Sequence, residues 1–222
     1  MRIVLVVAAH ADDEVLGCGG TIARHVAEGD TVYAVFMADG VTSRAQADTV
    51  DQAERNRAAE QARQILGIKQ NFYLDLPDNR LDSIPLVEVI QSLEPIIQQL
   101  RPSIIYTHHH GDLNVDHRIT HQAVLTACRP QPGSSVLEIY AFEVISSTEW
   151  NTLTVEPFLP NYHVDISEYL RTKLKALDAY QMEMRPAPHS RCIEHIEHLA
   201  KHRGYSMGLE AAESFVMIRR RR

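Results

Sequence analysis

The stretch Ile3-Val-Leu-Val-Val-Ala-Ala9, followed directly by His10-Ala-Asp-Asp-Glu14, decides the fold. Its seven consecutive apolar residues, many of them β-branched, indicate a short strand that is buried on both faces of a sheet. An imidazole and three carboxylates follow at once, and such a group is costly to bury without a neutralising cation. We therefore expect a buried strand that ends in a polar, cation-binding site.

Apolar segments alternate with helical patterns outward from this stretch. Further strands are expected at residues 31–37, 71–76, 103–107 and 136–144, and helices at residues 21–28, 52–66, 86–100 and 116–128. This alternation predicts the α/β fold class, with a mostly parallel sheet covered by helices on both faces.

The pattern changes after Val144. Prolines punctuate the chain, helices are expected at residues 167–184 and 192–203, and a last apolar stretch covers residues 215–218. No linker separates this part, so we expect a single domain over residues 1–222, with a core at 1–145 and a cap at 146–222.

Composition excludes several classes of function. The chain has 222 residues and a net charge of −7, which disfavours binding to nucleic acid. No stretch approaches the roughly 18 apolar residues of a membrane span. The odd set of Cys18, Cys128 and Cys192 indicates reduced thiols and a cytoplasmic location. The sequence leaves the oligomeric state open, and a homo-oligomer is compatible with it.

Polar loops follow each of the first four predicted strands, and the carboxyl ends of parallel strands form the ligand-binding edge of such a sheet. In a turn, His10 and Asp13 would point at one cation while Asp12 lies beside it. His117, at the start of a predicted helix, would add a third ligand. Two histidines and one aspartate leave a coordination position open, as in catalytic zinc sites. A water activated there, with Asp12 as base, predicts acyl-group hydrolysis.

Ala9-His-Ala-Asp-Asp-Glu14 closely resembles the A-H-P-D-D-E motif of the PIG-L/LmbE-like de-N-acetylases, and Asn114-Val-Asp-His117 resembles their second motif, His-x-Asp-His. The resemblance extends through Asp39-Gly40, Ser43-Arg44, Arg57-Ala-Ala-Glu60, Arg203-Gly204 and Ala212-Glu-Ser-Phe215, and so covers nearly the whole chain.

This resemblance implies a Rossmann-like three-layer α/β/α fold. It also implies a zinc-dependent hydrolase that removes acetate from the 2-acetamido group of an N-acetylglucosamine-type conjugate, with Fe²⁺ or another divalent transition metal as an alternative to Zn²⁺. The roles carried over by motif are metal binding for His10, Asp13 and His117, base catalysis for Asp12, and orientation of an imidazole for Asp116. Arg44, Arg57 and Asp78 are the implied substrate-binding residues.

Two residues depart from the family pattern. Ala11 replaces a proline but removes no functional group. Asn114 replaces the first histidine of the second motif; an amide can donate a hydrogen bond to an oxyanion but cannot deliver a proton at neutral pH. The general acid therefore stays open between His110, His109 and protonated Asp12.

A function of another class is also compatible with the loops. In a receiver-like signalling module that binds Mg²⁺, an acidic pair follows the first strand, and Asp12-Asp13, Asp75 and Thr107 resemble that arrangement. Against it, the fifth predicted strand ends in Phe142-Glu-Val144 rather than in a lysine, and such a module has no use for His10 or His117.

Overall fold

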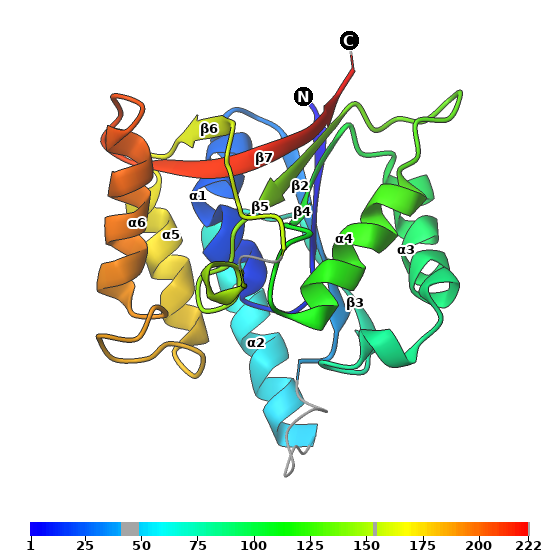
Figure 1. Ribbon diagram of the computed structural model, residues 1–222, viewed down its shortest axis with the longest axis horizontal. Coiled ribbons are helices and arrows are strands. Elements are labelled where there is room, and N and C mark those ends of the chain that lie inside the picture. Colours follow the sequence, from blue (N-terminus) through cyan, green and yellow to red (C-terminus); the bar gives the residue numbers. More distant parts are fainter. Residues whose placement is uncertain (41–48, 153–154, 222) are drawn as a thin grey trace.

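The computed structural model describes residues 1–40, 49–152 and 155–221. Within these ranges, strands from both halves of the chain form one seven-stranded sheet in the order β3-β2-β1-β4-β5-β7-β6 (Figure 1). The strands are β1 (Ile3–Ala8), β2 (Thr31–Ala38), β3 (Gln70–Leu76), β4 (Ile104–His108), β5 (Glu138–Phe142), β6 (Tyr162–Asp165) and β7 (Ala212–Arg220).

The first five strands are parallel, as the alternating pattern predicts. β1 lies in the centre of this part, with Val4 opposite both Val32 of β2 and Ile104 of β4. β7 then pairs antiparallel with β5, and β6 pairs antiparallel with β7. The predicted α/β class with a mostly parallel sheet is confirmed.

Helices cover both faces of the sheet. Helices α1 (Asp13–Ala27), α2 (Thr49–Leu66), α5 (Leu170–Leu177) and α6 (Ile193–Tyr205) lie on one face, and α3 (Leu86–Leu100) and α4 (Val115–Ala127) on the other (Figure 1). Alternate residues of β1 serve the two layers: Val4 and Val6 pack under the first group, and Leu5 and Val7 under the second. None of the described helices has the length and apolar character needed to cross a bilayer.

Three elements differ from expectation. The first helix begins at Asp13 rather than at residue 21, because the acidic residues after β1 form its first turn. The long helix expected at residues 167–184 is shorter, with α5 passing into the 3₁₀ turn Asp178–Tyr180. The strand β6 was not predicted; it has only four half-buried residues, too few to show an alternating pattern.

The segment expected to act as a cap also contributes to the sheet. β6 and β7 extend it beyond β5, and α5 and α6 cover these added strands and α1. Side chains from this segment can therefore reach the carboxyl edge of the parallel strands, where the polar loops meet.

Candidate metal-dependent active site

The turn between β1 and α1 has a strained backbone. Asp12 has a φ angle of 124°, which residues other than glycine rarely adopt. The amide of His10 donates to Asp13 Oδ2 (2.9 Å), and the amide of Asp12 donates to Glu14 Oε2 (3.0 Å). These local bonds hold the turn so that consecutive acidic side chains take different directions.

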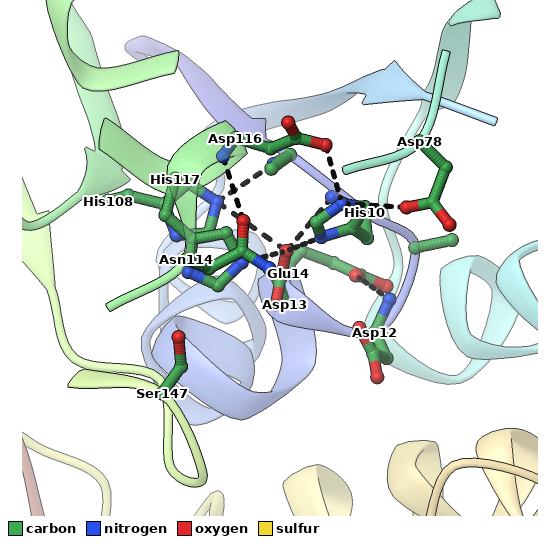
Figure 2. Close-up of polar contacts among 12 residues, drawn as sticks. His10, Asp12, Asp13, Glu14, Asp78, His108, Asn114, Asp116, His117 and Ser147 are labelled. Atoms are coloured by element: carbon green, nitrogen blue, oxygen red, sulfur yellow. Dashed lines mark hydrogen bonds and ion pairs between the residues drawn. The ribbon is translucent and has the colours of Figure 1, made fainter. Parts of the chain in front are cut away.

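His10, Asp13 and His117 converge on one point from the β1–α1 turn and from α4 (Figure 2). Asp13 Oδ2 lies 3.3 Å from His10 Nδ1 and 3.3 Å from His117 Nε2, and one ligand atom from each residue falls within 4.8 Å of the others. All three side chains are buried, and Asp13 Oδ1 has no hydrogen-bond partner among the residues that the structure describes. The predicted ligand set is thus brought together.

The electrostatics of this cluster suit a cation. Burial opposes ionisation of Asp13, but its interactions with the imidazoles of His117 and His108 hold its pKa well below the ordinary value. Burial would lower the pKa of His117, yet Asp13 and Asp112 raise it to about 9. The carboxylates therefore draw protons onto imidazoles that must be neutral to bind a metal, and a divalent cation can take the place of those protons.

Each histidine of this candidate metal site has a carboxylate behind it. Asp116 Oδ2 lies 3.1 Å from His10 Nε2, and Asp116 is itself fixed by the amides of Asn79 (2.7 Å) and Leu81 (3.0 Å). Asp112 Oδ2 lies 3.2 Å from His117 Nδ1. Such partners orient imidazole ligands and raise their basicity.

Asp12 faces the cavity beside this cluster. Burial raises its pKa, and Arg191, whose Nη1 donates to Asp12 Oδ2 at 2.7 Å, acts in the opposite direction. The pKa of Asp12 is thus higher than that of an exposed aspartate, so this carboxylate takes up a proton more readily.

A cavity of about 190 Å³ opens over His10, Asp12 and His117. Its walls are predominantly polar and come from both halves of the chain: His10, Asp12, Gly40, Arg55, Asp78, Asn79, Asn114, His117, Ser146, Ser147, Glu183 and Arg191.

Comparison with known proteins agrees with this arrangement. Residues 5–128, which include both motifs, match the family described as PIG-L, GlcNAc-PI de-N-acetylase. The chain belongs to the PIG-L family. The predicted resemblance is therefore confirmed, and membership supports a de-N-acetylase, a hydrolase that acts on an N-acetyl group.

Curated relatives of this PIG-L chain carry deacetylase names. It is 32% identical to the uncharacterized deacetylase YaiS of Escherichia coli K12, over 80% of this chain and 90% of that one. It is 30% identical to a probable N-acetyl-alpha-D-glucosaminyl L-malate deacetylase 2 of Bacillus cereus, over 82% of this chain and 84% of that one.

Solved structures share the fold. The N,N'-diacetylchitobiose deacetylase of Pyrococcus horikoshii is 23% identical with a TM-score of 0.78, covering 98% of this chain and 84% of that one. A 4-carboxy-2-hydroxymuconate hydratase of Pseudomonas putida has the same TM-score of 0.78 at 20% identity. At these identities the likeness shows the fold alone.

Two other predicted residues, Asp78 and Asn114, line the cavity. Asp78 lines it, with Oδ1 at 3.1 Å from His10 Nε2. Asn114 also lines it; its Oδ1 accepts the amide of Asp116 (2.8 Å) as the N-cap of α4, and its Nδ2 donates to Asn79 Oδ1 (3.0 Å). The amide that replaces a histidine in the second motif therefore has a structural role.

Two predicted residues lie away from the cavity. His110 points to Glu156, with 3.0 Å between Nε2 and the carboxylate, and is not part of the cavity wall. Arg57 is exposed on α2; Arg55, two residues earlier, lines the cavity instead. Arg44 lies outside the described residues.

Several cavity residues were missed at the sequence level. Arg55 donates from Nη1 to the carbonyl of Ala11 (3.2 Å) and from Nη2 to Glu183. Glu183 and Arg191 belong to the proline-rich segment, where no motif marks them. Asp112 had a usable signal, since it lies in the polar loop after β4.

The receiver-like alternative finds no support in the geometry. Thr107 is fully buried and does not line the cavity. Asp75 is exposed and accepts a hydrogen bond from Gln52 Nε2 (3.3 Å).

Proposed function

We propose that this protein is a zinc-dependent hydrolase that removes the acetyl group from an N-acetylated amino sugar, an N-acetylglucosamine-type conjugate. The observation that carries the proposal is the buried cluster of His10, Asp13 and His117 with Asp12 alongside, of which His10, His117 and Asp12 line one polar cavity. The names of the relatives, which include GlcNAc-malate, diacetylchitobiose and GlcNAc-inositol deacetylases, support this substrate class.

His10, Asp13 and His117 would hold the metal. When bound, a divalent cation supplies Lewis-acid polarisation and lowers the pKa of a water. The unpartnered Oδ1 of Asp13 and the two-imidazole, one-carboxylate donor set favour zinc, with Fe²⁺ as an alternative.

Asp12 removes a proton from the attacking water while the water oxygen forms a bond to the amide carbonyl carbon. The carbon–nitrogen bond then breaks, acetate leaves, and protonated Asp12 returns the proton to the amine nitrogen. Asp12 is suited to both steps because burial raises its pKa while Arg191 restrains that rise. Of the three candidates for the general acid, we propose Asp12, since His110 is bound to Glu156 and the His109 ring contacts the Glu156 carbonyl (3.1 Å).

The polar wall suits a sugar rather than an apolar ligand. Arg55 and Asp78 both line the cavity and offer a donor and an acceptor for hydroxyl groups. We also propose a cytoplasmic location, because the three cysteines are free and buried.

The test combines metal analysis with acetate release. Wild-type protein, stripped with chelator and reloaded with Zn²⁺, is assayed on N-acetylglucosamine, diacetylchitobiose, GlcNAc-malate and GlcNAc-inositol. Asp12→Asn should lose about 10²–10⁴-fold in kcat while binding one equivalent of metal. Glu88→Gln, an exposed change of the same kind on α3, should behave as wild type. Undiminished turnover by Asp12→Asn, or full activity without any transition metal, would refute the proposal.

A further inference from the structure

Helix α1 is broken shortly after the active-site turn. Cys18, within Gly17-Cys-Gly-Gly20, has φ −148° and ψ 25°, which is not helical. In a regular helix the carbonyl of Leu16 accepts the amide hydrogen of Gly20, four residues later. Here each of these two groups has a different, charged partner.

A buried ion pair is inserted at the break. Lys173 Nζ, from α5, donates to the carbonyl of Leu16 (2.8 Å) and to Glu213 Oε1 (2.6 Å). Glu213, from β7, accepts the amide of Gly20 at Oε1 (3.0 Å) and the amide of Thr21 at Oε2 (2.7 Å). The lysine thus satisfies the carbonyl on one side, and the glutamate satisfies the amides on the other.

Both charges are almost fully removed from water. Lys173 is 4% exposed and Glu213 is 5% exposed. A buried pair of this kind is stable only when each charge is matched by its partner and by further hydrogen bonds, and both conditions are met here. The negative carboxylate also lies at the amino end of the second half of α1, where the helix dipole favours it.

The glycines around the break allow this close approach. A Cβ on Gly19 would lie 3.2 Å from Lys173 Cγ, and a Cβ on Gly20 would lie 2.8 Å from Ile166 side-chain atoms. A Cβ on Gly17 would overlap the ring of Phe142. The glycines therefore allow Phe142 of β5, Ile166 and Lys173 of α5 to pack closely against the broken helix.

The short segment before the break carries the reactive groups. Asp13–Gly17 is little more than one helical turn, and Asp13 is its first residue, with Asp12 as its N-cap. A segment this short has few bonds of its own to fix its direction. Its carboxyl end is instead tied, through Leu16, to Lys173 and Glu213.

We propose that the Lys173–Glu213 ion pair is a positioning device for the active site, which joins the two halves of α1 and so holds the turn of Asp12 and Asp13 in register with His117. The proposal rests on the proposed metal-dependent function for its catalytic consequence. Its structural part, the fixing of the Asp13–Gly17 turn, does not depend on the substrate.

The experiment uses the full chain with Glu213→Gln and with the double change Lys173→Met and Glu213→Gln. We measure the Kd for Zn²⁺ by chelator competition, kcat and KM on the substrate found above, and amide hydrogen exchange of residues 10–17 without metal. Expected results are a Kd weakened about 10–100-fold, as for loss of other ligand-orienting groups, a lower kcat with little change in KM, and faster exchange in the turn. Glu213→Gln keeps a carbonyl oxygen for Lys173, so it carries the test should the double variant not fold.

Leu66→Ala is the matched control, since this buried residue ends α2, which precedes the edge strand β3. It should lower Tm without changing the Kd for Zn²⁺ or the exchange of residues 10–17. Wild-type Kd and exchange in the ion-pair variants would overturn the proposal, as would equal changes in Leu66→Ala at equal loss of Tm. If the ion-pair variants show weaker binding and faster exchange but no protein deacetylates any substrate, the proposed function fails while the positioning role stands.

Discussion

Removal of the Arg191 charge should shift the pH dependence of the reaction. Burial raises the pKa of Asp12, and the guanidinium of Arg191, with Nη1 at 2.7 Å from Oδ2, is the strongest opposing influence. An opposite charge within hydrogen-bond reach typically lowers a carboxyl pKa by about 1–3 units. The Arg191 side chain is 19% exposed, so solvent screens part of this effect. We therefore expect Arg191→Met to raise the pKa of Asp12 further.

The direction of this shift in the pH profile follows from the proposed role of Asp12 as a base. The residue must be deprotonated to act, so a higher pKa moves the acidic limb of the kcat/KM profile to higher pH. At pH values on the acidic side of the profile, kcat/KM of Arg191→Met should be about 10–100-fold lower than that of wild type. The difference should disappear as the pH rises. The assay is acetate release over a range of pH, with zinc content measured at each point.

Two further variants sharpen the result. Arg191→Lys keeps the charge and should give a smaller shift. Arg185→Met removes a guanidinium of the same segment that, within the described residues, donates to the backbone carbonyls of Met182 and Met184, and it should leave the limb unchanged. An acidic limb that stays in place, or moves to lower pH, in Arg191→Met would show that Asp12 is not the titrating base.

Other variants test neighbouring parts of the structure. Asp112→Asn should weaken zinc binding about 10–100-fold, because Asp112 orients His117; unchanged affinity by chelator competition would contradict this. Burial raises the pKa of Asp30, but hydrogen bonds from Arg2 and His25 outweigh it and lower this pKa to about 2. The Asp30 carboxylate therefore stabilises the fold at pH values above its unfolded pKa, and this stabilisation is lost as the pH falls toward 2. With Arg2 half exposed, Asp30→Asn should cost about 1 kcal/mol and about 2–4 °C in Tm at pH 7, with no difference from wild type in acid unfolding below pH 2. His110→Gln should keep wild-type kcat, and a large loss would return His110 to the candidates for the general acid.

The parallel half of the fold was predictable because its signals are local. The apolar run of β1 and the alternation that follows it specify strands buried on both faces, and these require helices above and below. The antiparallel strand β6 has no comparable local pattern in the sequence. β6 has four half-buried residues, and its place in the sheet depends on pairing with β7, about fifty residues later in the chain.

The candidate site shows the same limit. His10, Asp13 and His117 occur in compact motifs, and the topology of a parallel sheet brings those motifs together. Arg191 and Glu183 reach the cavity only because the C-terminal segment folds back over α1, which depends on long-range packing. Arg57 shows the remaining difficulty, since a shift of two residues along a helix changes the face on which a side chain lies.

The place of β7 between β5 and β6 has a consequence for synthesis of the protein on the ribosome. Until Ala212–Arg220 emerges, the backbone groups along one side of β5 lack their strand partner, and Glu213 is not yet present to cap the broken helix. Catalytic competence should therefore arise late and all at once during translation, and a nascent chain stalled before Ala212 should be prone to aggregation and a substrate for chaperones.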